Sequence, residues 1–432
     1  MTGTGRDTIY ALSSGSPPAA VAIVRISGPA ALVALQQLTD IAPALPRHAR
    51  LATLRHPVGG EALDRALVLH FTGPDSATGE DVAELHLHGG RAVIASVLAA
   101  LCSIDGLRPA EAGEFTRRSF ENGRVDLAEA EGLADLLLAE TESQRRAALA
   151  LAGGSVSHLV EDWQRRVLAL AADVEACLDF SDEGDVAEGL PSSWHEELAR
   201  LAEEMGSLLS RPAIERLRDG LRVSIAGPPN AGKSSLLNAL AGREAAIISD
   251  IAGTTRDLIE APTAIGGAPF LLIDTAGLRD GADEIEAIGI SRTRLSLEQA
   301  DIILWLGAPC DCPDPPRSII VQAKADLNPR IDARADIRVS AVTGQNMGKL
   351  IELLIARAEG LLPKEGEVAI NARHQAAIQE ARSFLDDTKS APDLLIVAES
   401  LRLCRVALDK VTGRAGVEDM LDALFGRFCI GK

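Results

Sequence analysis

The stretch GPPNAGKSS, residues 227–235, fits the phosphate-binding pattern G-x-x-x-x-G-K-[ST] at every required position. The apolar run 221–226 (LRVSIA) precedes it and leucines at helical spacing follow it, so the stretch is expected to join a buried strand to a helix. In such a loop, backbone N–H groups and the helix N-terminus bind phosphate, Lys233 reaches the terminal phosphates and Ser234 holds Mg²⁺. These flanks argue against a chance match within a loop.

The composition of the 432-residue chain is typical of a globular protein with a large core, since 47% of its residues are hydrophobic and 24% are charged. The length predicts about two to four domains. A net charge of −19 argues against a bulk electrostatic attraction to nucleic acid, and 3% aromatic residues leave few side chains for base stacking. Any contact with RNA should therefore be local or shared with a partner. No apolar run is long enough to span a membrane and no signal pattern opens the chain, which predicts a cytoplasmic protein without membrane contact.

Residues 1–120 mix strand and helix patterns and are expected to form an N-terminal α+β domain. The patterns predict strands at 8–12, 20–26, 66–73 and 83–90, and helices at 29–38 and 91–101. On the last of these strands, His86 and His88 alternate and face the same side. Since no third ligand is nearby, a structural or surface role is favoured over a metal site.

Long helical patterns begin at about residue 121 and enclose the phosphate-binding stretch. A first helical part, 121–216, is expected to hold helices at 126–151 and 193–209 and an apolar stripe from Leu159 to Cys177. A nucleotide-binding domain, 217–362, follows, and a second helical part, 363–432, contains helices at 371–387 and 394–408. The predicted fold class is therefore a multidomain combination of α/β and α structure, with a Ras-like P-loop domain inserted into a helical bundle.

Further nucleotide-binding motifs follow the phosphate loop in the order that GTPases require. Asp274, at the end of a buried strand, opens the D-x-x-G motif 274–277, in which Asp274 reaches Mg²⁺ through water and Gly277 contacts the γ-phosphate. Upstream, DIAGTTRD (250–257) provides Thr254 and Thr255 for the switch that closes over Mg²⁺.

The guanine-binding motif is imperfect, because 323–326 reads AKAD where N-K-x-D is usual. Asp326 can still accept hydrogen bonds from guanine, Lys324 can lie along the base, and Ser340 and Ala341 supply the last loop on the base side. The set of ordered motifs predicts a GTPase. The predicted GTP-binding residues are Asn230, Ala231, Gly232, Lys233, Ser234, Ser235, Ser249, Thr255, Asp274, Gly277, Lys324, Asp326, Ser340 and Ala341.

The residue after D-x-x-G is Leu278, whereas Ras-like enzymes carry a glutamine there that orients the attacking water. Hydrolysis must therefore use another polar group. The acidic stretch immediately downstream supplies candidates, namely Asp280, Asp283, Glu284 and Glu286.

These features together closely resemble the MnmE (TrmE) family of tRNA modification GTPases. The resemblance rests on Asn230 in the phosphate loop, on DIAGTTRD and DTAGLRD, on the inserted topology, on VRISG (24–28) and TGEDVAELHLHGG (78–90), and on the C-terminal FCIGK (428–432). It implies a homodimer whose N-terminal domain binds 5-formyl or methylene tetrahydrofolate. It also implies a heterotetramer with the FAD-containing protein MnmG, which adds an aminomethyl or carboxymethylaminomethyl group to carbon five of the wobble uridine of tRNA.

The resemblance also implies roles for single residues. Ser234 and Thr255 would bind Mg²⁺, and Asn230 would bind K⁺ with oxygens of Ser249, Ile251 and Thr254. The catalytic residues would be Glu286, which orients the water, and Cys429. For folate, the matching positions are Arg25, Glu84, Arg124 and Lys432, although many family members carry Lys where Arg124 stands. Without the resemblance, Cys429 is better interpreted as a packed or frayed thiol.

A second function class remains open, namely a regulatory GTPase that binds RNA or assembling ribosomes. Such proteins usually carry a basic RNA-binding module, and the sequence contains no such module. The folate-like N-terminal segment and the cysteine-containing tail favour the enzyme that modifies tRNA.

Overall fold

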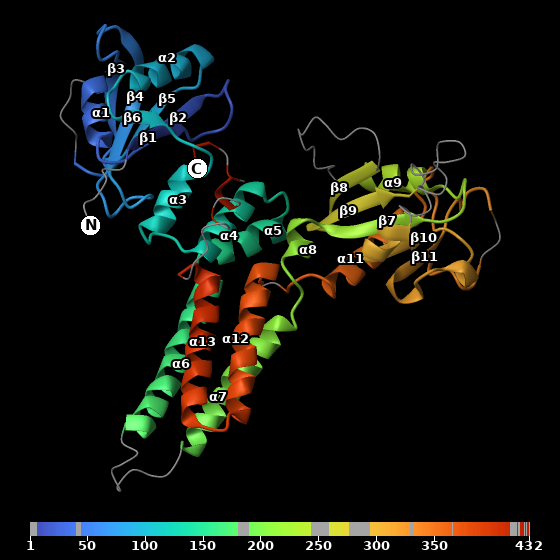
Figure 1. Cartoon of the computed structure of the whole chain (residues 1–432). Helices are drawn as coiled ribbons and strands as arrows, with labels where there is room; N and C mark the ends of the chain where they lie inside the picture. The colour runs from blue at the N-terminus through green and yellow to red at the C-terminus, as the bar shows by residue number, and fades with distance from the viewer. Residues whose placement is uncertain are drawn as a thin grey trace, which may run out of the picture. The chain divides into compact units, whose positions relative to one another are not determined.

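The computed structural model describes residues 7–39, 45–179, 190–242, 259–275, 294–328, 332–364, 366–414, 421, 424–426, 428 and 430–431. The chain separates into two compact units (Figure 1). One unit comprises Met1–Ala134 with Thr412–Lys432, and the other comprises Asp135–Val411. Within the described residues, no helix combines the length and the apolar character needed to cross a bilayer.

The first unit is built on a six-stranded sheet with the order β3-β4-β5-β2-β1-β6. Its strands are β1 (Thr8–Leu12), β2 (Val21–Ser27), β3 (Arg50–Arg55), β4 (Ala62–Phe71), β5 (Val82–His88) and β6 (Leu107–Pro109). Helices α1 (Ala31–Thr39) and α2 (Arg91–Cys102) cover one face, because alternate strand residues such as Val24 and Leu85 form one core with Leu38 and Leu101. The α+β pattern expected for this segment is therefore present.

Two of these strands, β3 and β6, were not predicted from the sequence. The residues of β3 (RLATLR) begin and end with arginine, and β6 is only three residues long and ends in Pro109. Neither segment carries the run of β-branched or aromatic residues that marks a strand in sequence. Pairing with β4 and β1 determines their structure instead.

Helix α3 (Glu114–Glu121) packs against the opposite face of the sheet through Phe115, which contacts Ile9 and Ala11 of β1. Its first residue lies in a partly buried ionic network. Arg108 donates to Glu114 at 2.7 Å and Arg118 donates to Glu114 at 2.9 Å. Burial opposes ionisation of Glu114, but hydrogen bonds from Arg108, from the N–H of Glu111 and from Arg118 prevail and lower its pKa to about 2.

Replacing Glu114 by Gln should lower the free energy that protects the backbone amides of α3 from hydrogen exchange by about 1–3 kcal/mol at pH 7. Arg108 and Arg118 would both lose the carboxylate that accepts their hydrogen bonds. A pKa lowered in the folded state contributes stability above its unfolded value, near 4.5, and this stability is lost as the pH falls to about 2. The difference between wild type and variant should shrink over this window, as measured by hydrogen–deuterium exchange of the full chain. Glu121→Gln, which removes a more exposed pair with Arg117, is the control and should change little. A pH-independent difference would contradict the argument.

The single helix predicted at 126–151 is wrong, because the structure divides it into α4 (Leu127–Leu138) and α5 (Glu142–Ala152). Thr141 accepts a hydrogen bond from the N–H of Gln144 at 3.3 Å, and the side chain of Gln144 accepts one from the N–H of Thr141 at 2.9 Å. This reciprocal capping box starts a new helix and interrupts the apolar periodicity.

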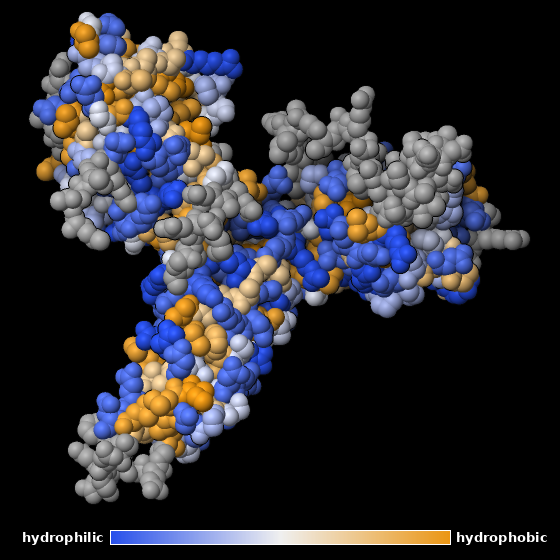
Figure 2. All heavy atoms as spheres, in the orientation of Figure 1, coloured by the Kyte–Doolittle hydropathy of each residue, from blue (hydrophilic) through white to orange (hydrophobic). Residues whose placement is uncertain are grey.

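Four long helices form the helical part of the second unit: α6 (Ser155–Asp179), α7 (Ser192–Leu209), α12 (Ala372–Ser390) and α13 (Leu394–Thr412). The predicted stripe on α6 is buried from Trp163 to Val174, but at its start Val160 is buried instead of Leu159, and at its end Cys177 is only half-buried. Apolar residues also gather on the visible face of these helices, toward the end at which α13 begins (Figure 2).

The nucleotide-binding part of the second unit is a six-stranded sheet with the order β12-β11-β10-β7-β9-β8. Only β8 (Ile259–Ile265) is antiparallel to its neighbour, β9 (Ala268–Asp274). The other strands are β7 (Leu221–Ala226), β10 (Ile302–Trp305), β11 (Ser318–Gln322) and β12 (Ile337–Arg338). Its helices include α8 (Glu215–Arg218), α9 (Lys233–Ala241) and α11 (Met347–Glu359), residues 294–299 are also helical, and single turns form η2 (Pro309–Asp311) and η3 (Pro315–Arg317). The carboxyl ends of the parallel strands thus share one edge, where α/β proteins bind ligands.

Candidate nucleotide-binding site

The phosphate-binding loop connects β7 to α9, as the sequence predicts. Its glycines are required by the backbone. Gly227 has a φ of 150°, and a Cβ there would lie 3.0 Å from the carbonyl carbon of Leu306. Gly232 has a φ of 100° at the start of α9. Because side chains are excluded at both ends, the loop can present its backbone N–H groups to a ligand.

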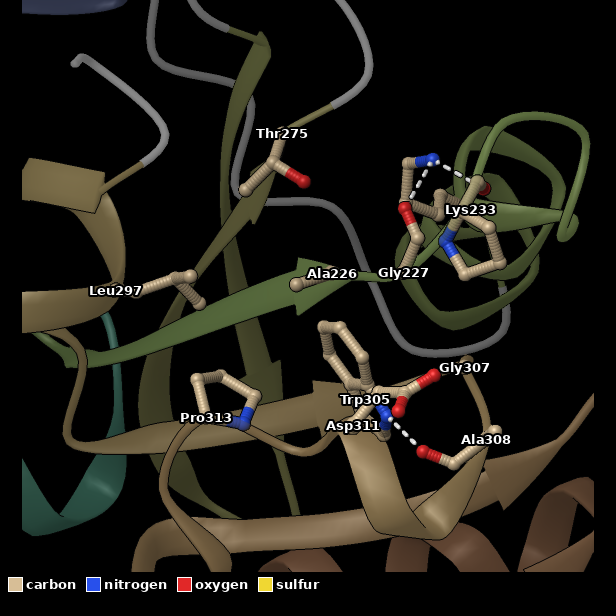
Figure 3. A pocket seen from close by; sticks show the side chains of 11 residues that line it. Ala226, Gly227, Lys233, Thr275, Leu297, Trp305, Gly307, Ala308, Asp311 and Pro313 are labelled. Atoms are coloured by element: carbon tan, nitrogen blue, oxygen red, sulfur yellow. Dashed lines mark hydrogen bonds between the residues drawn. The ribbon is translucent and has the colours of Figure 1, made fainter. Parts of the chain in front are cut away.

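Lys233, the first residue of α9, has a buried side chain that reaches back along this loop. Its Nζ donates to the carbonyl oxygens of Gly227 at 3.1 Å and Pro228 at 2.9 Å (Figure 3). The ammonium group is therefore held within the loop, at the position from which a lysine can neutralise terminal phosphates.

Two of the groups predicted to lie near Mg²⁺, the Ser234 hydroxyl and the Asp274 carboxylate, are side by side. Ser234 Oγ donates to Asp274 Oδ2 at 2.5 Å, and the Asp274 residue is only 1% exposed. The pairing of β7 with β9 produces this contact, because Ile225 is opposite Asp274 in the register. A hydroxyl and a carboxylate beside a phosphate loop form a donor set that suits Mg²⁺, which binds oxygen ligands.

The loops predicted to bind the guanine base lie at the same edge of the sheet as the phosphate loop. Lys324 Nζ donates to the carbonyl oxygen of Asn230 at 2.6 Å, which joins the loop after β11 to the phosphate loop. Ser340 Oγ donates to Asp326 Oδ1 at 2.6 Å and orients a carboxylate on an exposed residue. Asp326 is therefore held ready to accept from the N–H groups of a base. Ala341, next to Ser340, belongs to the same loop.

Ala323 lies against the phosphate loop, since a Cβ built on Gly232 would be 3.8 Å from the Ala323 Cβ. An asparagine at 323 could therefore bond to this loop and stiffen it. We expect Ala323→Asn to tighten GTP binding several-fold, because one hydrogen bond contributes about 0.5–1.5 kcal/mol. Isothermal titration would measure this change. Ala323→Leu, similar in size but without hydrogen-bonding atoms, should not tighten binding, and equal effects of both variants would contradict the explanation.

A cavity of about 380 Å³ adjoins the phosphate loop at the carboxyl ends of β7 and β10 (Figure 3). Gly227, Pro228 and Lys233 line one side of it, and Trp305 lines the other, with Trp305 Nε1 donating to the carbonyl oxygen of Ala308 at 2.9 Å. The volume is within the range of small-ligand sites. The sequence prediction missed Trp305, for which the available signal was an aromatic residue at the carboxyl end of a buried strand.

Several predicted residues lie outside the described part of the chain. They are Ser249, Ile251, Thr254, Thr255, Gly277, Glu286, Cys429 and Lys432. Of the predicted potassium ligands, only Asn230 is described; it is exposed and has a φ of 59°. Within the described residues, no three His, Cys, Asp or Glu side chains cluster as a metal site would require.

In the first unit, the structure brings together two of the residues predicted for folate. Arg25 Nε and Nη2 donate to Glu84 Oε1 at 3.0 and 2.8 Å, because the two residues are opposite each other on β2 and β5. The guanidinium carbon of Arg25 also lies 5.8 Å from the centre of the Phe115 ring. His86 Nε2 lies 3.4 Å from Glu84 Oε2.

The third described folate residue, Arg124, has a different neighbourhood. Its Nη1 lies 4.0 Å from Asp75 Oδ1, and a Cβ built on Gly79 would be 3.2 Å from its Cγ. Arg124 is thus placed beside the loop between β4 and β5, and no bond joins it to the Arg25–Glu84 pair among the described contacts.

Two family models match this chain. One, the MnmE helical domain, covers residues 127–429, and the other, the GTP-binding protein TrmE N-terminus, covers residues 8–124. The chain is 60% identical to the tRNA modification GTPase MnmE of Rhizorhabdus wittichii, over 99% of this chain and 97% of that protein. It is 56% identical to the protein of the same name from Erythrobacter litoralis, over 99% of this chain and 100% of that protein. It is also 56% identical to the protein of the same name from Sphingopyxis alaskensis, over 95% of this chain and 100% of that protein. The chain therefore belongs to the MnmE family of tRNA modification GTPases.

Proposed function

We propose that this chain hydrolyses GTP and couples hydrolysis to modification of the wobble uridine of tRNA in the cytoplasm. The observation that supports this proposal most directly is the convergence of Lys233, the Ser234–Asp274 pair and Asp326 on one sheet edge of an MnmE-family chain. Acting as a homodimer, and with an FAD-containing MnmG-type partner in a heterotetramer, it adds an aminomethyl or carboxymethylaminomethyl group to carbon five.

For hydrolysis, Ser234 would bind Mg²⁺ directly with Thr255, and Asp274 would bind it through water. When bound, the ion neutralises charge on the phosphates. Lys233 holds the terminal phosphates, and Asp326 selects guanine by accepting hydrogen bonds from its N–H groups. Glu286 orients the attacking water in place of the glutamine that Leu278 replaces.

A monovalent cation supports the same chemistry in this proposal. K⁺, held by Asn230 and by oxygens of Ser249, Ile251 and Thr254, would supply the positive charge that an arginine finger supplies in other GTPases. GTP turnover should therefore be faster in KCl than in NaCl at equal ionic strength. Asn230→Ala should remove this difference, and equal rates of the unmodified chain in both salts would exclude the cation.

The N-terminal unit would bind a tetrahydrofolate that carries the one-carbon group. The Arg25–Glu84 pair offers both donors and acceptors, which suits the polar edges of a pterin, and Arg124 and Lys432 would attract the glutamyl carboxylates. Cys429 would act as a nucleophile at this site.

The proposal is tested in a strain that lacks the chain, by mass spectrometry of tRNA nucleosides. The modified wobble uridine should disappear from this strain and return when the chain is expressed. Ribosome sedimentation profiles serve as the second readout. Normal wobble uridine with a defect in ribosome assembly would favour the alternative, a regulatory GTPase that binds RNA.

A further inference from the structure

The hairpin formed by β3 and β4 concentrates arginines in a chain whose net charge is −19. Arg50 and Arg55 begin and end β3, Arg65 lies on β4, and Arg47 precedes β3. All four residues are exposed. These four residues are called the β3–β4 basic surface below.

The charges of the β3–β4 basic surface are not neutralised by carboxylates. Among the described residues, Arg50 and Arg65 have no ion-pair partner, while Arg47 and Arg55 donate only to the carbonyl oxygens of Asp75 at 2.6 Å and Gly60 at 3.1 Å. Several other exposed arginines are paired; Arg165, for example, pairs with Asp162 at 2.9 Å and Arg402 with Glu399 at 2.7 Å.

The carboxylate of Asp64, which precedes Arg65 in the sequence, is also not paired with Arg65. Asp64 accepts from His88 Nδ1 at 2.7 Å and from the N–H of His88 at 2.9 Å, and its side chain is only 8% exposed. Its pKa is lowered, because hydrogen bonds from the backbone and ring of His88 outweigh the opposing effect of burial. The guanidinium of Arg65 is therefore exposed and has no carboxylate partner among the described residues.

The four arginines extend along the hairpin. Thr53 is opposite Arg65 in the middle of the strand pair, and the guanidinium carbon of Arg47 lies 5.7 Å from the centre of the Phe71 ring, at the end of β4. Arg50 is opposite Val68, so its side chain leaves the face of the hairpin opposite to that of Arg65, and the β3–β4 basic surface includes both faces of the hairpin. Residues 65 and 71 of one strand are about 20 Å apart at about 3.3 Å per residue. A surface of this length can contact several phosphates of a nucleic acid strand.

We propose that the β3–β4 basic surface binds the phosphate backbone of tRNA. The choice of RNA as the partner rests on the proposed function. The choice of phosphate as the contacted group rests on the chemistry of the arginine side chains. Each guanidinium group can donate two hydrogen bonds to one phosphate, whereas stacking of bases on aromatic rings needs such rings to be exposed, and Arg47 already covers Phe71. The contact is therefore local, as a chain with a strongly negative charge requires, and independent of sequence.

Protection of a sheet edge is the competing explanation, because β3 is the edge strand and charged side chains there prevent pairing with a second sheet. It accounts for Arg50 and Arg55. It does not account for Arg65, which lies on the inner strand β4, or for Arg47, which precedes the strand.

The test compares the unmodified full chain with Arg50→Glu/Arg55→Glu by fluorescence anisotropy of labelled tRNA from 50 to 200 mM KCl. We expect about a 10-fold loss of affinity at low salt, and a slope of log affinity against log salt that is shallower by about 2. Arg165→Glu/Arg402→Glu has the same change in net charge and should retain both the affinity and the slope.

Arg50→Gln/Arg55→Gln removes the two positive charges without introducing negative ones. If the contact is to phosphate, this variant should also lose affinity for tRNA, but less than Arg50→Glu/Arg55→Glu. Equal losses in the Arg165/Arg402 variant, or unchanged binding in the Arg50/Arg55 variants, would overturn the proposal. Self-association of these variants on a sizing column with unchanged tRNA affinity would establish edge protection instead. GTP hydrolysis should be unaffected throughout, so failure of this proposal leaves the nucleotide-dependent function intact.

Discussion

Replacing Lys233 by Ala should lower the affinity for GTP about 100-fold. The ammonium group lies within hydrogen-bonding distance of Gly227 and Pro228 and is the buried cation of the phosphate loop. Two charge-assisted hydrogen bonds to phosphate, each contributing about 1.5 kcal/mol, correspond to this change. Titration with a fluorescent GTP analogue would measure it.

The matched control is Lys349→Ala, which removes an exposed lysine of α11 in the same part of the chain. It should leave GTP affinity within about two-fold of the unmodified chain, since it removes no contact with the phosphate loop. Similar losses in both variants would mean that general charge, and not the position of Lys233, determines binding.

Replacing Glu286 by Ala should reduce the rate of GTP hydrolysis about 100-fold or more and leave GTP affinity nearly unchanged. A residue that orients the attacking water acts mainly in the transition state, so its loss lowers kcat without weakening ground-state binding. Single-turnover hydrolysis and an equilibrium titration measure the two quantities separately.

Glu284→Ala is the control for Glu286, because both glutamates lie in the same acidic stretch downstream of Leu278. It should retain most of the activity. If Glu284→Ala is the inactive variant instead, another carboxylate of this stretch orients the water and the assignment carried over from the family is wrong.

The sequence was sufficient to predict the nucleotide-binding part of the fold, because its signals are local. The phosphate loop needs glycine at fixed positions, and the buried strands are short apolar runs, so β7 and the strand that ends at Asp274, β9, were predicted. The proximity of Ser234 and Asp274 follows from the same motifs. The hydrogen bond from Lys324 to Asn230 could not be predicted from these motifs, because it depends on how two loops approach each other in space.

The first unit was less predictable, because tertiary pairing decides much of its structure. Strands β3 and β6 have no sequence pattern of their own. In the second unit, the capping box at Thr141 likewise ends a helical periodicity that otherwise appears continuous. Arg25 and Glu84 are 59 residues apart, and only the pairing of β2 with β5 brings them together. Their assignment to folate came from family resemblance and remains a prediction.

Whether GTP hydrolysis at this site drives tRNA modification can be measured in a reconstituted reaction. The full chain is mixed with its FAD-containing partner, a tetrahydrofolate and unmodified tRNA, and wobble uridine is quantified by mass spectrometry with GTP or with a non-hydrolysable GTP analogue. If hydrolysis drives the reaction, we expect modification with GTP, and little modification with the analogue or with the Glu286→Ala chain. Equal modification with GTP and with the analogue would contradict it.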